Sequence, residues 1–187
     1  MRKLLALPLM LLAVGASTPT YHYHLDGEHS TVSAKVGFLG LASKTARFPT
    51  MSGAITLQPD RLDSIDLDVE LDARALTAGD SVTLGRLKGK DFFDVEHYPS
   101  VHFSGRKMAM TGPITATVEG EVTARGVTLP AVLQVAFTEP PAKATGRDPV
   151  QLSARTTINR YDFGMKAYGM IVGKKVTIAI NAQMVPG

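Results

Sequence analysis

Apolar and polar side chains alternate with a period of two along most of this chain. In "SIDLDVELDA", residues 64–73, the apolar Ile65, Leu67, Val69 and Leu71 alternate with Asp66, Asp68, Glu70 and Asp72. Successive side chains of a β-strand point to opposite faces, so this pattern predicts a strand with one dry face and one wet face. Similar stretches occur at residues 20–25, 30–38, 52–58, 100–105, 114–124, 129–137, 150–158 and 175–185.

Turn residues separate these stretches, as at "QPDRLD", "MTGP" and "EPPAKATGRDP". Eight or more short strands with turns between them are typical of an antiparallel sandwich or barrel. Helix is expected only between Asp80 and Lys90, where Asp80 is the candidate N-terminal cap and Gly85 and Gly89 weaken the helix. We therefore predict an all-β domain with one short helix, without repeats or a domain linker.

Several side chains on the predicted dry faces are small. They are Ala34, Ala54, Ala116, Ala124, Ala154 and Ala182. A barrel of about eight strands is near the size at which its interior either fills with side chains or holds one small ligand. Small inward residues favour a lumen with room for a ligand. A filled β-domain that serves as a structural or interaction module is the open alternative.

The first residues predict an export signal. Arg2 and Lys3 precede an apolar run from Leu4 to Val14, and small residues follow it, so we place a signal peptide at residues 1–16 and cleavage after Ala16. The run is shorter than the roughly 20 residues of a membrane-spanning helix, so we expect no permanent membrane anchor. The mature domain would then be residues 17–187, located in a bacterial periplasm.

Charge and cysteine content exclude several function classes. Without Arg2 and Lys3, 18 basic and 17 acidic residues remain, a balance that argues against a nucleic-acid partner. The chain has no cysteine, which rules out disulfides, a thiolate nucleophile, a cysteine metal site and an acylated cysteine anchor. The fold must therefore be stabilised by its core alone.

Histidines are the main candidates for metal ligands or acid–base groups in this chain. His22 and His24 would lie on one face of a strand, as two metal ligands could, but this spacing is a weak signal. His97 and His102 are five positions apart and would face opposite sides of a regular strand. No Gly-x-Ser-x-Gly motif, phosphate loop or dinucleotide motif occurs. A metal-dependent or acid–base enzyme using these four histidines remains the alternative function; we assign no catalytic residue and no metal ligand.

Two further segments combine acidic and aromatic residues. In "DFFDVEHYPSVHF", residues 91–103, Asp91 and Asp94 bracket two phenylalanines, and we expect these carboxylates to accept backbone hydrogen bonds or to meet an arginine such as Arg160. In "TTINRYDFGM", residues 156–165, Arg160 and Asp162 indicate either a ligand mouth or an ion pair that fixes a loop, and the ion pair is favoured.

Taken in order, several segments resemble the YceI-like family of lipocalin-like bacterial proteins that bind polyisoprenoid and other amphiphilic lipids. The matching segments are "LDGEHSTVSAKVGFLGLASKTARF", "LKGKDFFDVEHYPSVHFSG", "VEGEVTARGVTLPAVLQVAF", "INRYDFGM" and "VGKKVTIAI". The resemblance implies an extended, eight-stranded antiparallel barrel with a helix beside it and an apolar cavity for a lipid tail. It implies no catalysis and no cofactor other than a bound lipid, such as a polyisoprenoid or a fatty amphiphile, held for sequestration or transport. The oligomeric state is left open between a monomer and a homodimer.

From the strand faces and this resemblance we assign a set of cavity residues. They are Val32, Ala34, Val36, Phe38, Ile65, Leu67, Phe92, Phe93, Phe103, Phe163 and Met165. Phe38 stands where the family commonly has a histidine, which predicts a drier and narrower end of its strand. Phe92 and Phe93 are expected to anchor the junction between the helix and the next strand.

Overall fold

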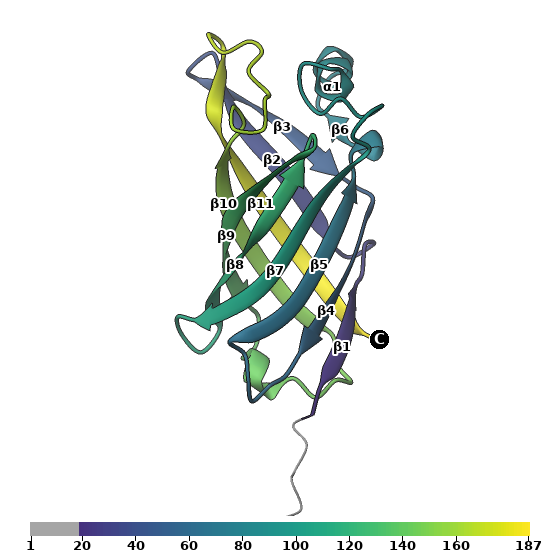
Figure 1. Ribbon diagram of the computed structural model, residues 1–187, viewed down its shortest axis with the longest axis vertical. Helices are drawn as coiled ribbons and strands as arrows, with labels where there is room; N and C mark the ends of the chain where they lie inside the picture. The colour runs from purple at the N-terminus through teal and green to yellow at the C-terminus, as the bar shows by residue number, and fades with distance from the viewer. Residues whose placement is uncertain (1–18) are drawn as a thin grey trace, which may run out of the picture.

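Eight antiparallel strands close into a barrel in the computed structural model, which describes residues 19–187 (Figure 1). In order around the ring they are β1 (Tyr21–Leu25), β4 (Met51–Leu57), β5 (Ser64–Asp72), β7 (Ser100–Met110), β8 (Thr115–Ala124), β9 (Val127–Phe137), β10 (Val150–Asn159) and β11 (Val172–Pro186). Pairing of Leu25 with Met184 joins β1 to β11 and closes the ring. The predicted all-β fold, an eight-stranded antiparallel barrel with one helix, is confirmed. The predicted signal peptide lies outside the described residues.

Three more strands extend the barrel at one end. The long strand β11 pairs with β1 near its C-terminus and with β2 (Thr31–Phe38) along the rest of its length, for example Val32 with Ile180. Beyond β2 the sheet continues into β3 (Ala42–Phe48) and the short β6 (Thr77–Ala78). The barrel wall is therefore completed by β1 at one end and by β2 at the other. We call the end with the β2–β3 turn the mouth end.

The helix α1 (Ser81–Lys88) lies beside the mouth end, where Asp80 caps it (Figure 1). The Asp80 carboxylate accepts a hydrogen bond of 2.8 Å from the Thr83 backbone N–H, which satisfies one of the unpaired donors of the first turn. Gly89 follows the helix, and its N–H donates to the carbonyls of Gly85 and Arg86. The predicted helix and its cap are confirmed. Two 3-10 turns, η1 (Ala73–Ala75) and η2 (Pro141–Lys143), complete the secondary structure.

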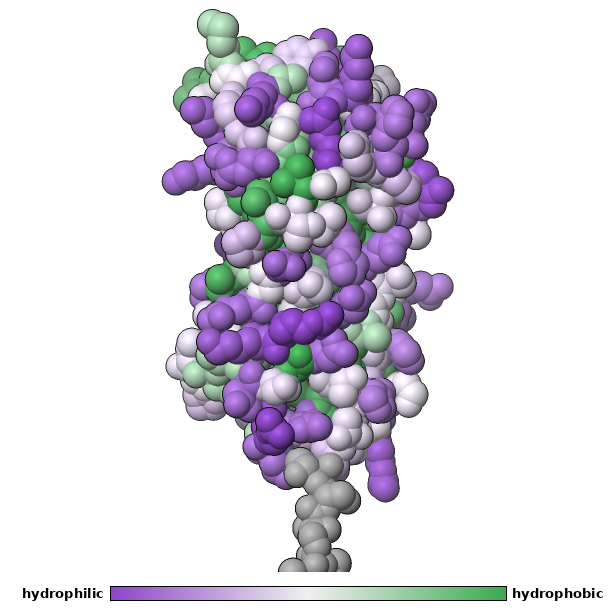
Figure 2. Space-filling model, viewed as in Figure 1, coloured by the Kyte–Doolittle hydropathy of each residue, from purple (hydrophilic) through white to green (hydrophobic). Residues whose placement is uncertain are grey.

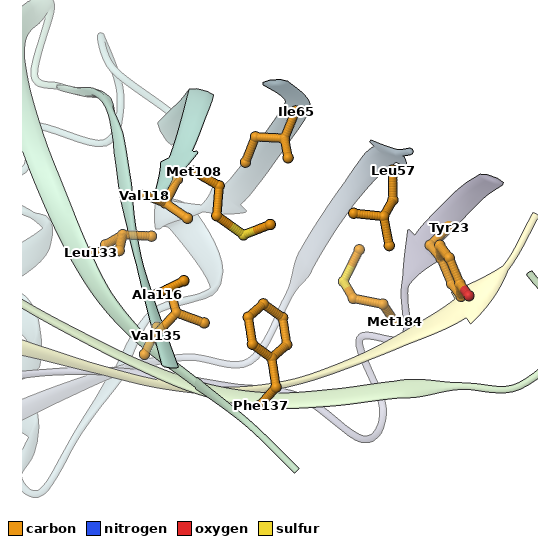
Figure 3. Packing of buried hydrophobic residues seen from close by; sticks show 11 residues of the cluster. Tyr23, Leu57, Ile65, Met108, Ala116, Val118, Leu133, Val135, Phe137 and Met184 are labelled. Carbon is orange, nitrogen blue, oxygen red and sulfur yellow. The ribbon is translucent and has the colours of Figure 1, made fainter. Parts of the chain in front are cut away.

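The inward strand faces form one continuous apolar interior, as the alternation predicts. Figure 3 shows part of it, the cluster Tyr23, Leu57, Ile65, Met108, Ala116, Val118, Leu133, Val135, Phe137, Ala154 and Met184, all buried. On β5 the carboxylates of Asp66 and Asp68 point outward, to Arg106 and His102. Two other buried clusters, around Phe163 and around Phe48, lie nearer the mouth end.

Candidate ligand cavity

Two apolar chambers lie inside the barrel. The mouth chamber has a volume of about 120 Å³ and is lined by residues of β2, β3 and α1, of the segments that follow α1 and β10, and of the ring strands β5, β7, β8, β10 and β11. The deep chamber has a volume of about 150 Å³ and lies between the inner faces of the eight ring strands. They share the lining residues Val32, Leu71, Val101, Val122 and Ile178. Because five side chains border both spaces, the chambers adjoin, and we refer to the two together as the tunnel.

Polar side chains are unevenly distributed along this tunnel. Apart from Ser30, His102 and Thr156, the deep chamber is lined by aliphatic side chains, methionines and phenylalanines. The mouth chamber also borders Lys44, Thr45, Thr83 and Arg160. Two of those four are cations. Both chambers can therefore hold an apolar chain, and the two cations lie at the mouth end.

Ten of the eleven residues assigned from the sequence line this tunnel. Val32, Ala34, Val36, Phe92, Phe93, Phe163 and Met165 line the mouth chamber, and Val32, Ile65, Leu67 and Phe103 line the deep chamber. They surround one apolar space for two reasons. Alternate side chains of each strand point inward, and the segment between α1 and β7 is buried at Phe92 and half-buried at Phe93. Their contact with a ligand stays a prediction.

Phe38 is the exception and lines neither chamber. Between Val172 and Val176 the register of β11 shifts against β2, and Phe38, the last residue of β2, pairs there with Val172, which itself lines the mouth chamber. Its ring is half-buried, and the Lys44 ammonium lies 5.3 Å from the ring centroid. The predicted narrowing of the cavity by Phe38 is thus corrected: its ring lies beside Lys44 at the end of β2 and does not border the chamber that its partner Val172 lines.

A pair of glycines, which the sequence reasoning missed, makes room for Phe103. Gly105 and Gly120 are cross-strand partners on β7 and β8. A Cβ on Gly120 would lie 2.8 Å from Cζ of Phe103 and 2.2 Å from the Ser104 carbonyl oxygen. The ring therefore lies against bare backbone and occupies space that side chains would otherwise take. Glycine inside a strand signals such a close approach, which is the clue that the sequence offered.

Phe92 and Phe93 anchor the segment between α1 and β7, as predicted. Phe92 is buried and stacks on Tyr168, with 6.1 Å between ring centroids and 5° between ring planes. Phe93 meets Phe48 of β3 edge to face at 5.7 Å. Both arrangements are favourable for aromatic pairs. The two rings join this segment to the β10–β11 loop and to β3 at the border of the mouth chamber.

Arg160 is a buried cation at the border of the mouth chamber, 3% exposed. Its guanidinium donates to the carbonyls of Gly173 at 2.8 Å, Val172 at 2.9 Å and Met165. Among residues 19–187 it forms no ion pair, and Asp162 instead accepts from the Asn159 amide at 2.9 Å. The predicted pairing of Arg160 with a carboxylate is wrong, because backbone carbonyls of the β10–β11 loop and of the start of β11 take its place.

Burial has an electrostatic consequence for Arg160. Desolvation lowers the pKa of its guanidinium from the ordinary value, since the charged form loses hydration. Three of its five N–H donors are used by the loop carbonyls. A positive charge thus lies beside the mouth chamber, stabilised by carbonyl dipoles and by the rings of Phe92 and Tyr161, whose centroids lie 5.7 Å and 4.9 Å from the guanidinium carbon.

The histidines do not assemble into a site. His22 contacts Thr56 at 3.2 Å, His97 contacts Asp94 at 3.0 Å, and His102 contacts Asp68 at 2.8 Å. No group of three or more histidines, aspartates and glutamates that could hold a metal occurs within residues 19–187. Asp94, by hydrogen bonding, raises the pKa of His97. These contacts are separate pairs at the surface. Within residues 19–187 the histidines named for the enzyme alternative are therefore not brought together in one site.

Backbone strain concentrates at the mouth end. Leu39, Asp94, Arg125 and Tyr168 all have positive φ, between 51° and 55°, although none is glycine. Such conformations are costly for L-residues and persist where the surroundings fix them. Arg125 shows how: its guanidinium donates to the carbonyls of Gly164 and Lys90, both at 2.7 Å. The loops around the mouth chamber are therefore held in defined positions.

Known proteins with a similar sequence or fold point to one family. A model of the YceI-like domain matches residues 23–184. A UPF0312 protein of Pseudomonas putida (strain GB-1) is 30% identical over 166 residues, covering 88% of this chain and 86% of the relative.

Two solved structures have the same fold. The BcnA protein of Burkholderia cenocepacia aligns with a TM-score of 0.75 at 21% identity, covering 85% of this chain and 98% of that one. A polyisoprenoid-binding domain from Saccharophagus degradans, implicated in plant cell wall breakdown, aligns with a TM-score of 0.68 at 14% identity over 88% and 98%. At these identities the two structures establish the barrel architecture.

Proposed function

Because the chain belongs to the YceI-like domain family, we propose that it is a binding protein, not an enzyme, which holds one amphiphilic lipid in its tunnel. The observation that carries this proposal is the pair of adjoining apolar chambers inside the closed barrel. The deep chamber takes the chain, and the mouth chamber takes the polar head. The ligand class we propose is an isoprenoid-like or fatty amphiphile, in keeping with the polyisoprenoid-binding domain of similar fold.

The tunnel has a length suited to a chain-shaped ligand. On β11 its lining residues run from Val172 to Met184. Twelve residue steps of a strand tilted as in a typical barrel correspond to roughly 30 Å along the barrel axis. With widths set by side chains on opposite walls, the space is long and narrow. This shape favours a linear chain over a compact polycyclic lipid.

The mouth end suits a polar or anionic head. Lys44 and Arg160 both border the mouth chamber. Lys44 also contacts Asp80 at 2.7 Å, and Arg160 uses three of its five N–H donors on backbone carbonyls, so an acceptor group there would join cations that already have partners. Charge-assisted hydrogen bonds are stronger where water is excluded, as it is around the buried Arg160. Recognition of the head group by Lys44 and Arg160 is the more specific part of the proposed function.

The place of action we propose is the periplasm, on the basis of the predicted signal peptide at residues 1–16. No helix among residues 19–187 has the length and apolar character needed to cross a membrane. In that compartment a protein with a closed apolar tunnel would sequester or carry its lipid through an aqueous space.

Native mass spectrometry of untagged protein, isolated from its own cell envelope, tests the proposal. We expect one bound lipid per chain, and a series of fatty acids of increasing length should then be titrated into delipidated protein. Each added methylene should tighten binding about fourfold, the equivalent of about 0.8 kcal/mol, until the chain outgrows the tunnel. Absence of bound lipid together with affinity independent of chain length would refute the proposal.

A further inference from the structure

Exposed apolar side chains gather at the mouth end. Of the nine large apolar side chains exposed within residues 19–187, five lie on two adjacent turns, and we call them the apolar tip: Leu39, Leu41, Tyr168, Met170 and Ile171. Leu41 and Met170 are fully exposed. The Leu39 backbone N–H donates to the Ile171 carbonyl at 2.8 Å, which holds the β2–β3 turn against the β10–β11 loop. Figure 2 shows green and pale-green atoms at the upper left end, where Figure 1 draws this loop.

The apolar tip is continuous with the ligand tunnel. Tyr168 stacks on Phe92, and Ile171 precedes Val172 in the chain; both Phe92 and Val172 line the mouth chamber. The Arg86 guanidinium of α1 lies 4.5 Å from the Tyr168 ring centroid, so a cation flanks the tip directly. Exposed apolar surface of this kind marks an interaction site, and here it adjoins the mouth chamber.

Charge is distributed unequally between the two ends of the barrel. The mouth-end segments 38–44, 80–98, 125–126 and 160–175 contain nine basic and five acidic residues. The segments at the far end, 58–63, 111–114 and 138–149, contain three basic and four acidic residues. The mouth end therefore carries a net charge of +4 and the far end −1. Lys166 and Lys174, both exposed, lie on the segment that carries most of the apolar tip.

We propose that the apolar tip docks on the surface of a lipid bilayer that contains anionic phospholipids, which brings the tunnel entrance to the membrane. The proposal rests on the proposed lipid-binding function and names the partner surface of that site. Apolar side chains flanked by lysine and arginine match the interface of an anionic bilayer, where the chains enter the acyl region and the cations meet phosphates. A second copy of the chain is disfavoured as the occupant, because it would bring two positive ends together.

Co-sedimentation with vesicles tests this docking. Wild-type protein should bind phosphatidylcholine vesicles that contain phosphatidylglycerol, bind pure phosphatidylcholine vesicles less, and dissociate as salt is raised. The double variant Leu41→Asn, Met170→Asn should bind at least about tenfold more weakly, since it removes two apolar side chains from the contact. The matched control is Ile114→Asn, which makes the same kind of change at the far end, where Ile114 is 40% exposed; it should bind as wild type does.

Two further measurements separate this docking from its competitors. Uptake of a fluorescent fatty acid added from ethanol should be the same in the double variant and the wild type, whereas uptake from vesicles should be slower in the variant. Failure of uptake in every protein would refute the tunnel function and leave the vesicle result to decide docking. Three results would each overturn the docking. They are wild-type protein that does not bind anionic vesicles, a double variant that binds like wild type, and a dimer in sedimentation velocity that depends on the apolar tip.

Discussion

Filling the deep chamber should abolish ligand binding while the barrel survives, and Ala154→Phe is the sharpest way to do it. Ala154 is 3% exposed, lies on β10, and pairs with Val135 and Ile180, so its methyl group points into the deep chamber. A phenyl ring at this position projects into a space of about 150 Å³ that is otherwise open. The ring would thus compete with the ligand chain for the same volume.

The expected magnitude follows from the chain segment that the ring displaces. If the ring takes the place of four ligand methylenes, the loss is about 3 kcal/mol, which corresponds to about 200-fold in Kd. The free energy of unfolding without ligand should fall by no more than about 1–3 kcal/mol, the usual cost of overpacking a core. The free energy of binding should therefore fall by at least as much as the free energy of unfolding, and the barrel should stay folded.

Titration of a long-chain fatty acid, with urea unfolding of the delipidated proteins, measures both quantities. Ala136→Phe is the matched control, because Ala136 lies on the neighbouring strand β9 but is exposed on the outer face. The control should bind as wild type does. An Ala154→Phe protein that is folded and binds with unchanged affinity would place the ligand elsewhere and refute the tunnel.

Three other changes test the anchor, the helix cap and the close packing of the barrel. Phe93→Ala should lower the free energy of unfolding in urea by about 2–3 kcal/mol, below the range for a fully buried ring because Phe93 is half-buried; a loss confined to lipid uptake would contradict this anchoring role. Hydrogen bonding to Lys44 lowers the pKa of Asp80, so its stabilising contribution is present above the unfolded pKa of about 4 and is lost as pH falls below it. Urea unfolding midpoints should therefore be measured from about pH 6 to about pH 2, roughly the range in which carboxylates titrate. They should fall less in Asp80→Asn than in wild type, and parallel curves would contradict the stabilising role of the Asp80 carboxylate. Gly120→Ala should destabilise the barrel by about 1–3 kcal/mol in the same urea assay, whereas Gly37→Ala, where a Cβ would meet nothing within 4 Å, should not; equal effects would refute the close approach.

The sequence predicted the regular part of the barrel because there each side chain has one of two environments. On β8 the alternation of Ala116, Val118, Val122 and Ala124 with polar residues corresponds directly to inside and outside. The strand β3 was not predicted, because its first four residues are exposed or half-buried on both faces and give no alternation. It lies outside the closed ring, so fewer of its side chains face the core.

The extent of the cavity was beyond prediction from the sequence pattern, because open volume is what remains after many side chains have packed. Parity placed Phe38 on the inward face with Val32, Ala34 and Val36, but the structure has it at the register shift in β11, where it lines neither chamber. The hydrogen-bond partners of Arg160 could not be predicted from the sequence either. Backbone carbonyls carry no sequence signal, so the nearby Asp162 was the obvious but wrong partner.

The two ends of the tunnel therefore differ in how they could select a ligand. The deep chamber offers mainly apolar contacts, which depend on buried area and discriminate weakly between saturated, unsaturated and branched chains of equal length. The mouth chamber offers the cations Lys44 and Arg160, and a buried Arg160 distinguishes a head group that accepts hydrogen bonds from one that cannot. Selectivity among amphiphiles should accordingly reside in the head group and in chain length, because these are the properties to which a narrow apolar tunnel with a charged mouth responds.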